Sequence, residues 1–292
     1  MNVLTFDIEE WYLEKSYFGN HSEKYAEYDK YLGNILDILD EQKYKATFFC
    51  LGGMATDFPN VIQSIASRGH EIGCHSFKHV WLNQMAEKEV FEDTRTSIDA
   101  IEQCIGRKVL SYRAPAFSIG KGNKWAFEVL AQNGIRRDAS IFPAERDFGG
   151  FEGFGKNIPT MVYCNRVMLK EFPICTTKIF GKEVAYSGGG YFRFFPMKFI
   201  KSEMAKSEYN MTYFHIADLV PETAGIMSKQ DFEKYFKVPG TLKNRLLRHL
   251  KTNVGKKGSM TKLSKLLKDD IFISLGQADS MIDWNNQPSV VI

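Results

Sequence analysis

The chain has 292 residues, of which 44% are apolar and 14% aromatic, so it can bury a sizeable core and disorder is excluded. Its formal net charge of +3 is too small to indicate nucleic-acid binding by the whole chain. The five cysteines are scattered and contain no C-x-x-C pair, which argues against both a disulfide framework and a thiolate zinc site.

Cysteine usage and the first residues bear on the compartment. Unpaired, scattered cysteines fit a reducing environment. The chain starts MNVLTFDIEEWY, with acidic residues where a signal peptide needs an apolar run, and no stretch is long and apolar enough for a membrane span. We therefore expect a soluble, cytoplasmic protein.

Strand and helix patterns alternate along the first 140 residues. Residues 2–8 are apolar and β-branched and end in carboxylates, which is typical of a buried strand with polar groups at its carboxyl end. The same reasoning predicts further strands at 45–52, 70–75 and 109–115, and helices at 31–42, 60–69, 89–106 and 124–134, the last three closed by glycines. This alternation indicates parallel strands with crossover helices, in a barrel or a doubly wound sheet.

The remaining chain has a looser pattern. Residues 210–219 offer one more strand with a histidine at its end, and a basic helical tail follows. Residues 237–268 contain ten Lys or Arg and no Asp or Glu. One interpretation is a solvated basic face on a core-packed helix, and the other is attraction to anionic lipid headgroups or a sugar diphosphate. Leucines recur at helical spacing in this stretch: Leu242, Leu246, Leu247 and Leu250.

Histidines and carboxylates supply the candidate chemistry. His75 and His79 stand four residues apart, so a helical turn or a wide loop could aim both rings at one metal ion. Successive strand residues face opposite sides, so Asp7 and Glu9 point the same way and Glu10 faces away. Two histidines and one carboxylate with an open position are typical of a catalytic metal site. The alternatives are polar surface histidines and a solvated acidic turn.

Two further residues end predicted strands. Arg113 can hold a carboxylate in one orientation and keep it ionised. His215 follows an apolar run, where a histidine is either a hydrogen-bonded core group or a catalyst. Either reading remains open from the residues alone.

Seven stretches resemble, in chain order, the motifs of the polysaccharide deacetylase family, the NodB homology domain of carbohydrate esterase family 4: LTFDIEEW, KATFFCLG, GHEIGCHSFKH, SYRAPAFSI, DASIFP, SGGGYFR and YFH. The first motif is similar to that of a branch reading F-D-V-E-D-W, often found with surface-polysaccharide biosynthesis. The resemblance implies an α/β fold, a distorted (β/α) barrel with about seven parallel strands. We expect a catalytic domain over residues 1–225 and a basic helical C-terminal extension over 226–292 packed on it.

The resemblance also implies a reaction and roles. Members hydrolyse the N-acetyl group of an amino sugar with zinc or a related divalent ion, Co²⁺, Ni²⁺, Mn²⁺ or Fe²⁺, and release acetate. By match to the motifs, Asp7 is the catalytic base, Arg113 positions that base, and His215 is the general acid. His75 and His79 match the metal-binding histidines.

One departure concerns the third metal ligand. The usual first motif has two adjacent aspartates, and this chain has Ile8 in the second place. Because Glu9 shares a face with Asp7, we expect Glu9 to be the substitute ligand, with Glu10 or a site of histidines alone as alternatives. Arg137, before Asp138, also departs from the related branch, which often has Tyr there.

The resemblance places substrate contacts in three later motifs, at Pro115, Asp138, Gly189, Tyr191 and Arg193. The glycine-rich stretch could equally be a tight turn beside core aromatics. We expect the substrate to be a lipid- or nucleotide-linked N-acetylated glycan precursor for O-antigen or capsule, with peripheral membrane contact through the basic C-terminal region and no nucleic-acid partner. The alternatives are an allantoinase-like or imide amidohydrolase and a non-catalytic carbohydrate-binding barrel.

Overall fold

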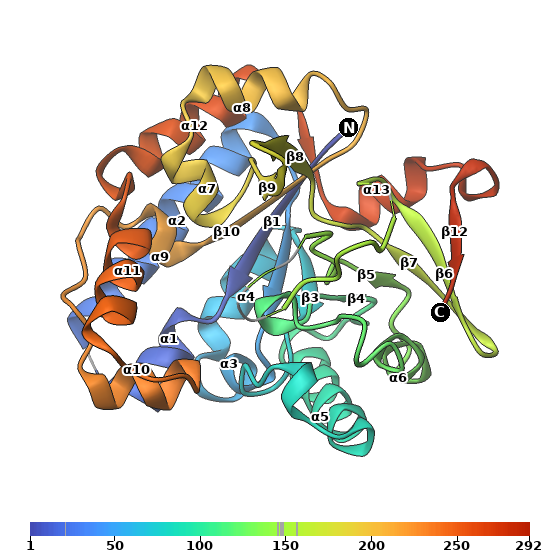
Figure 1. Cartoon of the computed structure of the whole chain (residues 1–292), viewed down its shortest axis with the longest axis horizontal. Coiled ribbons are helices and arrows are strands. Elements are labelled where there is room, and N and C mark those ends of the chain that lie inside the picture. Colours follow the sequence, from blue (N-terminus) through green and yellow to red (C-terminus); the bar gives the residue numbers. More distant parts are fainter. Residues whose placement is uncertain (21, 145, 147–148, 156) are drawn as a thin grey trace.

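Parallel strands form the centre of the molecule (Figure 1). The computed structural model describes residues 1–20, 22–144, 146, 149–155 and 157–292. Seven strands lie side by side, all parallel, in the order β10 (Asn210–His215), β1 (Asn2–Ile8), β2 (Thr47–Cys50), β3 (Glu71–Cys74), β4 (Ser111–Tyr112), β5 (Arg137–Asp138) and β7 (Val167–Glu171). The predicted number and direction of the strands are confirmed.

The sheet is extended on one side and remains open. β6 (Thr160–Cys164) pairs antiparallel with β7, and β12 (Ser289–Val291) pairs with β6. β11 (Phe272–Ile273) pairs with the start of β1, and β8 (Thr176–Ile179) forms a separate hairpin with β9 (Lys182–Ala185). Within the described residues no ladder joins β10 to β12, so the barrel is distorted and not closed.

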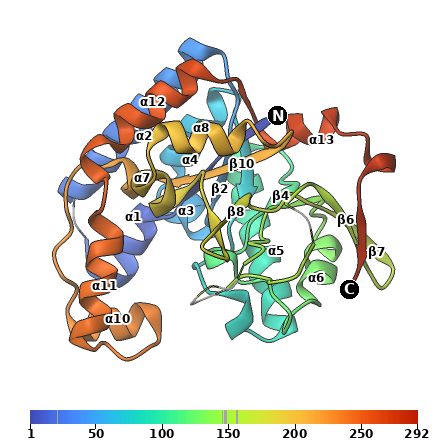
Figure 2. The ribbon, with the colours of Figure 1, turned by 45° about the horizontal axis from the view of Figure 1, so that its top comes forward.

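Helices surround the strands (Figures 1 and 2). The crossover helices are α2 (Ser22–Gln42), α4 (Pro59–Ser67), α5 (Glu87–Ile105) and α6 (Ala126–Gln132). Shorter helices are α1 (Glu10–Leu13), which continues into a π-helical turn at Glu14–Phe18, α3 (Gly52–Asp57), α7 (Gly189–Phe194), α8 (Met197–Met204) and α9 (Ile216–Leu219). The predicted helices all form, with boundaries shifted by two residues or fewer except at the start of α2.

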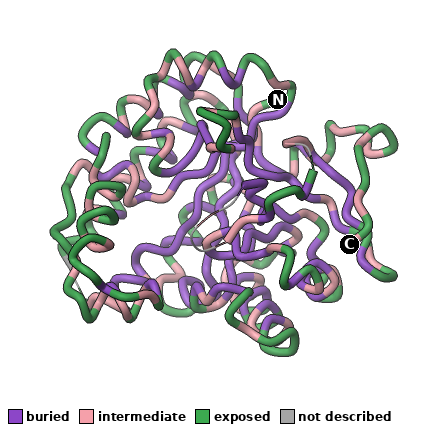
Figure 3. The backbone as a smooth tube through the Cα atoms, in the orientation of Figure 1, coloured by how far each residue is buried: buried purple, intermediate pink, exposed green. Residues whose placement is uncertain are grey.

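The sheet is the buried core of the molecule (Figure 3). On β1, both faces are buried: Leu4, Phe6 and Ile8 lie on one, and Val3, Thr5 and Asp7 on the other. A parallel sheet covered on both faces buries both sets of alternate side chains, which explains the nearly continuous apolar run. Polar side chains buried at the strand ends are therefore the exceptions that need a functional explanation.

Residues 226–292 form α10 (Lys229–Phe236), α11 (Leu242–Asn253), α12 (Ser259–Asp269) and α13 (Leu275–Met281), together with β11 and β12. α12 packs on α2, and α10 packs on the π-helical turn. α12 buries its leucines, but α11 buries none of its residues, so the core-packed interpretation of the basic stretch is wrong for α11. Among the described residues, no helix has the length and apolarity needed to cross a membrane.

Candidate metal and catalytic site

The carboxyl ends of β10, β1, β3 and β4, on one edge of the sheet, bring the predicted residues together. Asp7 is opposite His215 in the pairing of β1 with β10. His75 and Arg113 each stand one residue beyond a strand, and their backbone N–H groups continue the ladder, to Cys50 O at 2.9 Å and to Cys74 O at 3.0 Å. This edge is where parallel α/β folds place their chemistry.

Glu9, His75 and His79 form a cluster of metal-ligating side chains. Their ligand atoms all lie within 4.8 Å of one another. Oε2 of Glu9 is 2.7 Å from Nε2 of His79 and 3.4 Å from Nε2 of His75. All three side chains are almost fully buried, which no isolated polar group tolerates without a partner.

The donor set of this cluster fits a divalent cation. Nδ1 of His75 lies 2.7 Å from the carbonyl oxygen of Arg113, so it donates its proton there and Nε2 faces Glu9 as a lone pair. Oε2 of Glu9 is buried and has no hydrogen-bond partner among the described residues. Burial alone would raise the pKa of the Glu9 carboxyl, but His79 and His215 hold it well below its ordinary value. One carboxylate and two imidazoles facing one another are the donor set of a zinc-type site.

A strained loop, not a helix, positions His79. Ser76 and His79 both adopt positive φ, 65° and 61°. The loop is fixed because Oγ of Ser76 accepts a hydrogen bond from the His79 N–H at 3.1 Å, while carbonyls of the loop accept from Gly52 and Gly53. Backbone strain of this kind persists only where the surroundings over-determine it, and it is frequent at functional sites.

Glu10 is not part of the cluster with His75 and His79, and it begins α1 after β1 has ended at Ile8. Its carboxyl accepts a hydrogen bond from the N–H of Ala217 at 2.7 Å. Burial raises the pKa of Glu10 to about 7, whereas the charge of His215 opposes that rise. The structure therefore brings Glu9, and not Glu10, to the histidines.

Asp7 forms a buried ion pair with Arg113. Nη1 of Arg113 donates to Oδ1 of Asp7 at 2.8 Å and to Oγ1 of Thr5 at 2.8 Å, and Nε donates to the carbonyl of Ala139 at 3.1 Å. The guanidinium also lies 4.3 Å from the centre of the Phe49 ring. These contacts fix the orientation of the guanidinium and hence of the Asp7 carboxylate.

His215 has the most exposed side chain of these site residues. Its side chain is 31% exposed, against 9% or less for Asp7, Glu9, His75 and His79. Nε2 lies 3.8 Å from Oδ2 of Asp7 and 3.6 Å from Oε1 of Glu9.

Asp218 holds the other ring nitrogen of His215. Its Oδ2 lies 3.1 Å from Nδ1 and accepts from the His215 N–H at 3.2 Å. Burial would lower the pKa of His215, but the carboxylates of Glu9 and Asp218 raise it to about 10. The sequence reasoning missed Asp218. Its signal is a carboxylate three residues after a strand-end histidine, the spacing of a helix cap.

Three of the five predicted substrate-contact residues are buried or bonded to other residues of this chain. Arg193 pairs with Asp218 at 3.1 Å, and its guanidinium donates to the carbonyls of Lys251 at 3.1 Å and Val254 at 3.0 Å at the end of α11. Asp138 is fully buried beside Glu171, and Pro115 is buried in the turn after β4. Protein groups thus already engage the side chains of Arg193 and Asp138, and their contact with a substrate stays a prediction.

The glycine-rich stretch is a close backbone approach. A Cβ at Gly188 would lie 2.2 Å from the Tyr213 ring, and Gly189 adopts φ +51° at the start of α7. Tyr191 is partly exposed and packs on the core. The stretch thus contains the tight turn beside a core aromatic, and Tyr191 retains an exposed part.

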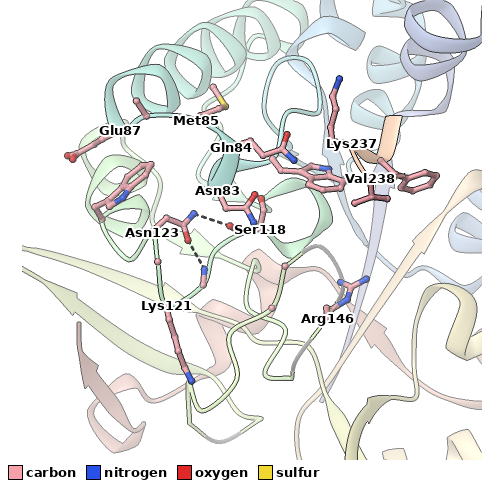
Figure 4. Close-up of a pocket in the computed structure, with 18 residues that line it drawn as sticks. Asn83, Gln84, Met85, Glu87, Ser118, Lys121, Asn123, Arg146, Lys237 and Val238 are labelled. Atoms are coloured by element: carbon pink, nitrogen blue, oxygen red, sulfur yellow. Dashed lines mark hydrogen bonds between the residues drawn. The ribbon is translucent and has the colours of Figure 1, made fainter. Parts of the chain in front are cut away.

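A groove of about 830 Å³ begins two residues after His79, at Trp81, and none of the cluster's own side chains lines it (Figure 4). The loops that follow His79 and Arg113 line it, with Trp81 from the first and Trp125 from the second. The third wall is the end of α10, Phe236 to Val238. The ring of Tyr235, the residue before this wall, lies parallel to the His79 ring at 6.5 Å. The sequence reasoning missed Trp81, Trp125 and Tyr235, because nothing local distinguishes them from core aromatics.

Comparison with known families divides the chain into two regions. Residues 3–137 match the model described as polysaccharide deacetylase, and residues 139–278 match a domain of unknown function, DUF3473. The fold, the site and this match together assign a class to the N-terminal part of the chain: residues 3–137 belong to the polysaccharide deacetylase family.

Individual relatives cover part of the chain. A peptidoglycan-N-acetylglucosamine deacetylase of Bacillus cereus is 36% identical over 95 residues, 32% of this chain and 34% of that protein. A chitooligosaccharide deacetylase of Rhizobium leguminosarum bv. trifolii is 33% identical over 86 residues, 28% of this chain and 40% of that protein. The chain thus matches well under half the length of either relative. A crystal structure from Mycobacterium smegmatis, classed as a polysaccharide deacetylase, shares 18% identity at a TM-score of 0.63 over 100% of this chain and 92% of that one, and it supports the fold.

Proposed function

We propose that this chain is a divalent-metal-dependent hydrolase that removes the acetyl group from an N-acetylated amino sugar and releases acetate. The observation that carries the proposal is the convergence of Glu9, His75 and His79 beside the Asp7–Arg113 pair. Membership of residues 3–137 in the polysaccharide deacetylase family and relatives named for deacetylation of peptidoglycan and chitooligosaccharide support it.

The metal would be held by Glu9, His75 and His79. Zinc suits two imidazoles and a carboxylate best, and Co²⁺, Ni²⁺, Mn²⁺ or Fe²⁺ accept the same ligands. When bound, such an ion polarises the acetamide carbonyl and lowers the pKa of the attacking water.

The chain's own residues move the protons. Asp7, held in position by the hydrogen bond from Arg113, accepts the proton of the attacking water. His215 is protonated near neutral pH because its pKa is raised to about 10 by Glu9 and Asp218 against the effect of burial. Its Nε2 faces the site and donates the proton to the departing amine nitrogen.

We place the substrate among lipid- or nucleotide-linked N-acetylated precursors of surface polysaccharide. The groove presents Trp81 and Trp125, whose rings can stack on sugar faces. We further propose a cytoplasmic location at the inner face of the membrane. The five cysteines are all free, which supports a reducing compartment. The division into a catalytic unit over 1–225 and an extension over 226–292 stays part of this proposal.

The test is Asp7→Asn, which keeps the size of the side chain and removes the base. We expect the variant to bind metal in wild-type amount and to release acetate at least about a hundredfold more slowly from an N-acetylglucosamine oligosaccharide. Asp99→Asn, on the exposed face of α5, is the matched control. Wild-type turnover by Asp7→Asn would refute the assigned role.

A further inference from the structure

The helix α11 carries an unpartnered apolar face. Leu242, Leu246 and Leu250 recur four residues apart and therefore form one stripe along the helix. They are 60%, 39% and 58% exposed, and Leu247 beside them is 47% exposed. Four exposed leucines on one twelve-residue helix are a contiguous patch, unlike the single apolar residues that ordinary surfaces expose.

A second stripe of α11 is polar and consists of Arg245, His249 and Asn253. Side chains of this polar stripe, and not the leucines, hold the helix to the protein. Asn253 exchanges two hydrogen bonds with the backbone of Ala224, at 2.9 and 3.0 Å, and also contacts His249. Arg245 donates to the carbonyl of Met227 at 3.1 Å. A soluble helix ordinarily buries its apolar stripe and exposes its polar one, so α11 is reversed. Ile226, on the segment held by the polar stripe, is exposed as well.

The charge around this face is one-sided. Lys243 lies among the exposed leucines, and residues 237–268 hold ten Lys or Arg and no Asp or Glu. Acids nearby are Asp231 and Glu233 on α10 and Glu222 on the segment that Asn253 contacts, and the ten Lys or Arg outnumber them. A second copy of the chain would bring like charges together across a two-fold interface. An anionic surface with an apolar interior complements both the leucines and the lysines.

We propose that the leucine face of α11 docks on an anionic lipid membrane. The helix would lie in the interface plane, with the leucines among the acyl chains and the lysines at the headgroups. Figure 2 shows α10 and α11 together at one edge of the molecule.

Docking there would place the lipid on one side of α11 and the groove on the other, because Arg248 lies about 240° around the helix from Leu242. Arg248 of α11 lies over the ring of Phe236 at 4.6 Å, and Phe236 lines the groove. The neighbouring Tyr235 lies against the His79 ring. The substrate class that fits this arrangement is a glycan carried on a membrane lipid, and this part of the inference rests on the proposed function.

The test is vesicle sedimentation with the full chain. Vesicles of phosphatidylcholine, with and without phosphatidylglycerol, separate apolar insertion from anionic attraction. We expect binding to the phosphatidylglycerol vesicles, and a loss of at least about tenfold in the triple variant Leu242→Ser, Leu246→Ser, Leu250→Ser. The leucines are not buried, so the variant should keep the wild-type melting temperature. The control is Phe180→Ser with Ile271→Ser, which removes exposed apolar groups elsewhere and should bind as wild type.

Three results overturn the docking proposal. The first is no vesicle binding by the wild type, and the second is unchanged binding by the triple variant. The third is that neither protein binds vesicles while the wild type is a dimer and the triple variant a monomer, which would assign the leucine face to a second copy of the chain. Metal content and acetate release from a water-soluble substrate are measured on the same preparations. If the protein binds vesicles but holds no metal and releases no acetate, the proposed function is contradicted and the docking proposal is not.

Discussion

Two adjacent glutamates show how contacts, more than residue type, set chemistry. Glu9 and Glu10 are both buried. The histidines outweigh burial at Glu9 and lower its pKa, whereas burial dominates at Glu10 and raises its pKa to about 7. Glu9 is therefore the residue available as an anionic ligand.

The Glu9 assignment predicts a difference between matched variants. Glu9→Gln removes the charged ligand and should weaken zinc binding by about tenfold or more, whereas Glu10→Gln should leave it unchanged. Zinc titration of the metal-free chains measures both. A larger loss in Glu10→Gln would move the ligand to Glu10.

Asp138 and Glu171 form a second buried acidic pair, away from the metal ligands. Burial raises the pKa of Asp138 to about 6, and burial together with Asp138 raises that of Glu171 well above its ordinary value. Oδ2 of Asp138 and Oε2 of Glu171 have no hydrogen-bond partner among the described residues, which fits a proton held between the two carboxyls.

This pair predicts a pH-dependent stability. Both folded-state pKa values are raised, so the stabilisation is full below about pH 4 and is lost as the pH rises through about 6 and beyond. Glu171→Gln cannot ionise and should reduce this loss by an amount on the order of 2 kcal/mol. The measurement is the free energy of unfolding at about pH 5 and about pH 8. An equal pH dependence in wild type and variant would contradict the shared proton.

Several site residues could be predicted from the sequence because the pattern is local. The strand period of two predicts Asp7 and Glu9 on one side, and both lie near His215, whereas Glu10 lies apart because it begins α1. Asp218 and Arg193 could not be assigned in this way. Their partners come from other elements, His215 at the end of β10 and the carbonyls that end α11, so tertiary contacts decide their roles.

At the scale of elements, α11 depends on a distant arginine. Arg193 on α7 donates to carbonyls of Lys251 and Val254, which the helix end leaves without intrahelical partners. It thereby ties α11 to Asp218 and the site.

Loss of the Arg193 contacts should make α11 open more often. In Arg193→Met we expect hydrogen exchange of residues 242–254 to speed up by about tenfold, because hydrogen bonds of roughly 1.5 kcal/mol are removed. Arg95→Met, which breaks an exposed pair within α5, is the control. Unchanged exchange in Arg193→Met would show that other contacts hold the helix.

Element boundaries separate what periodicity can predict from what it cannot. The pattern predicts a helix from residue 31, but α2 begins at Ser22. The added turns are mostly polar and are held by contacts with α1, including the hydrogen bond from Trp11 to Asp29 at 3.0 Å. β11 and β12 have two and three residues, too few to show a hydrophobic period in the sequence. They form because β1 and β6, far away in the sequence, pair with them.

At the scale of the molecule, the two family regions complete one site. The first region supplies Asp7, Glu9, His75 and His79, and it ends at residue 137. The second, residues 139–278, supplies His215 and covers the site with α10. The constellation therefore needs both regions, joined through the pairing of β1 with β10.

The central claim is that this chain is a metal-dependent deacetylase. The most direct measurement is acetate release from N-acetylglucosamine oligosaccharides and a nucleotide-linked N-acetyl sugar, before chelation, after chelation and after zinc is restored. We expect acetate release to stop on chelation and to return with zinc. The variant His75→Ala, His79→Ala should release no acetate under any of the three conditions. Release that survives chelation, or a zinc-loaded wild type that frees no acetate from either substrate class, would contradict the account.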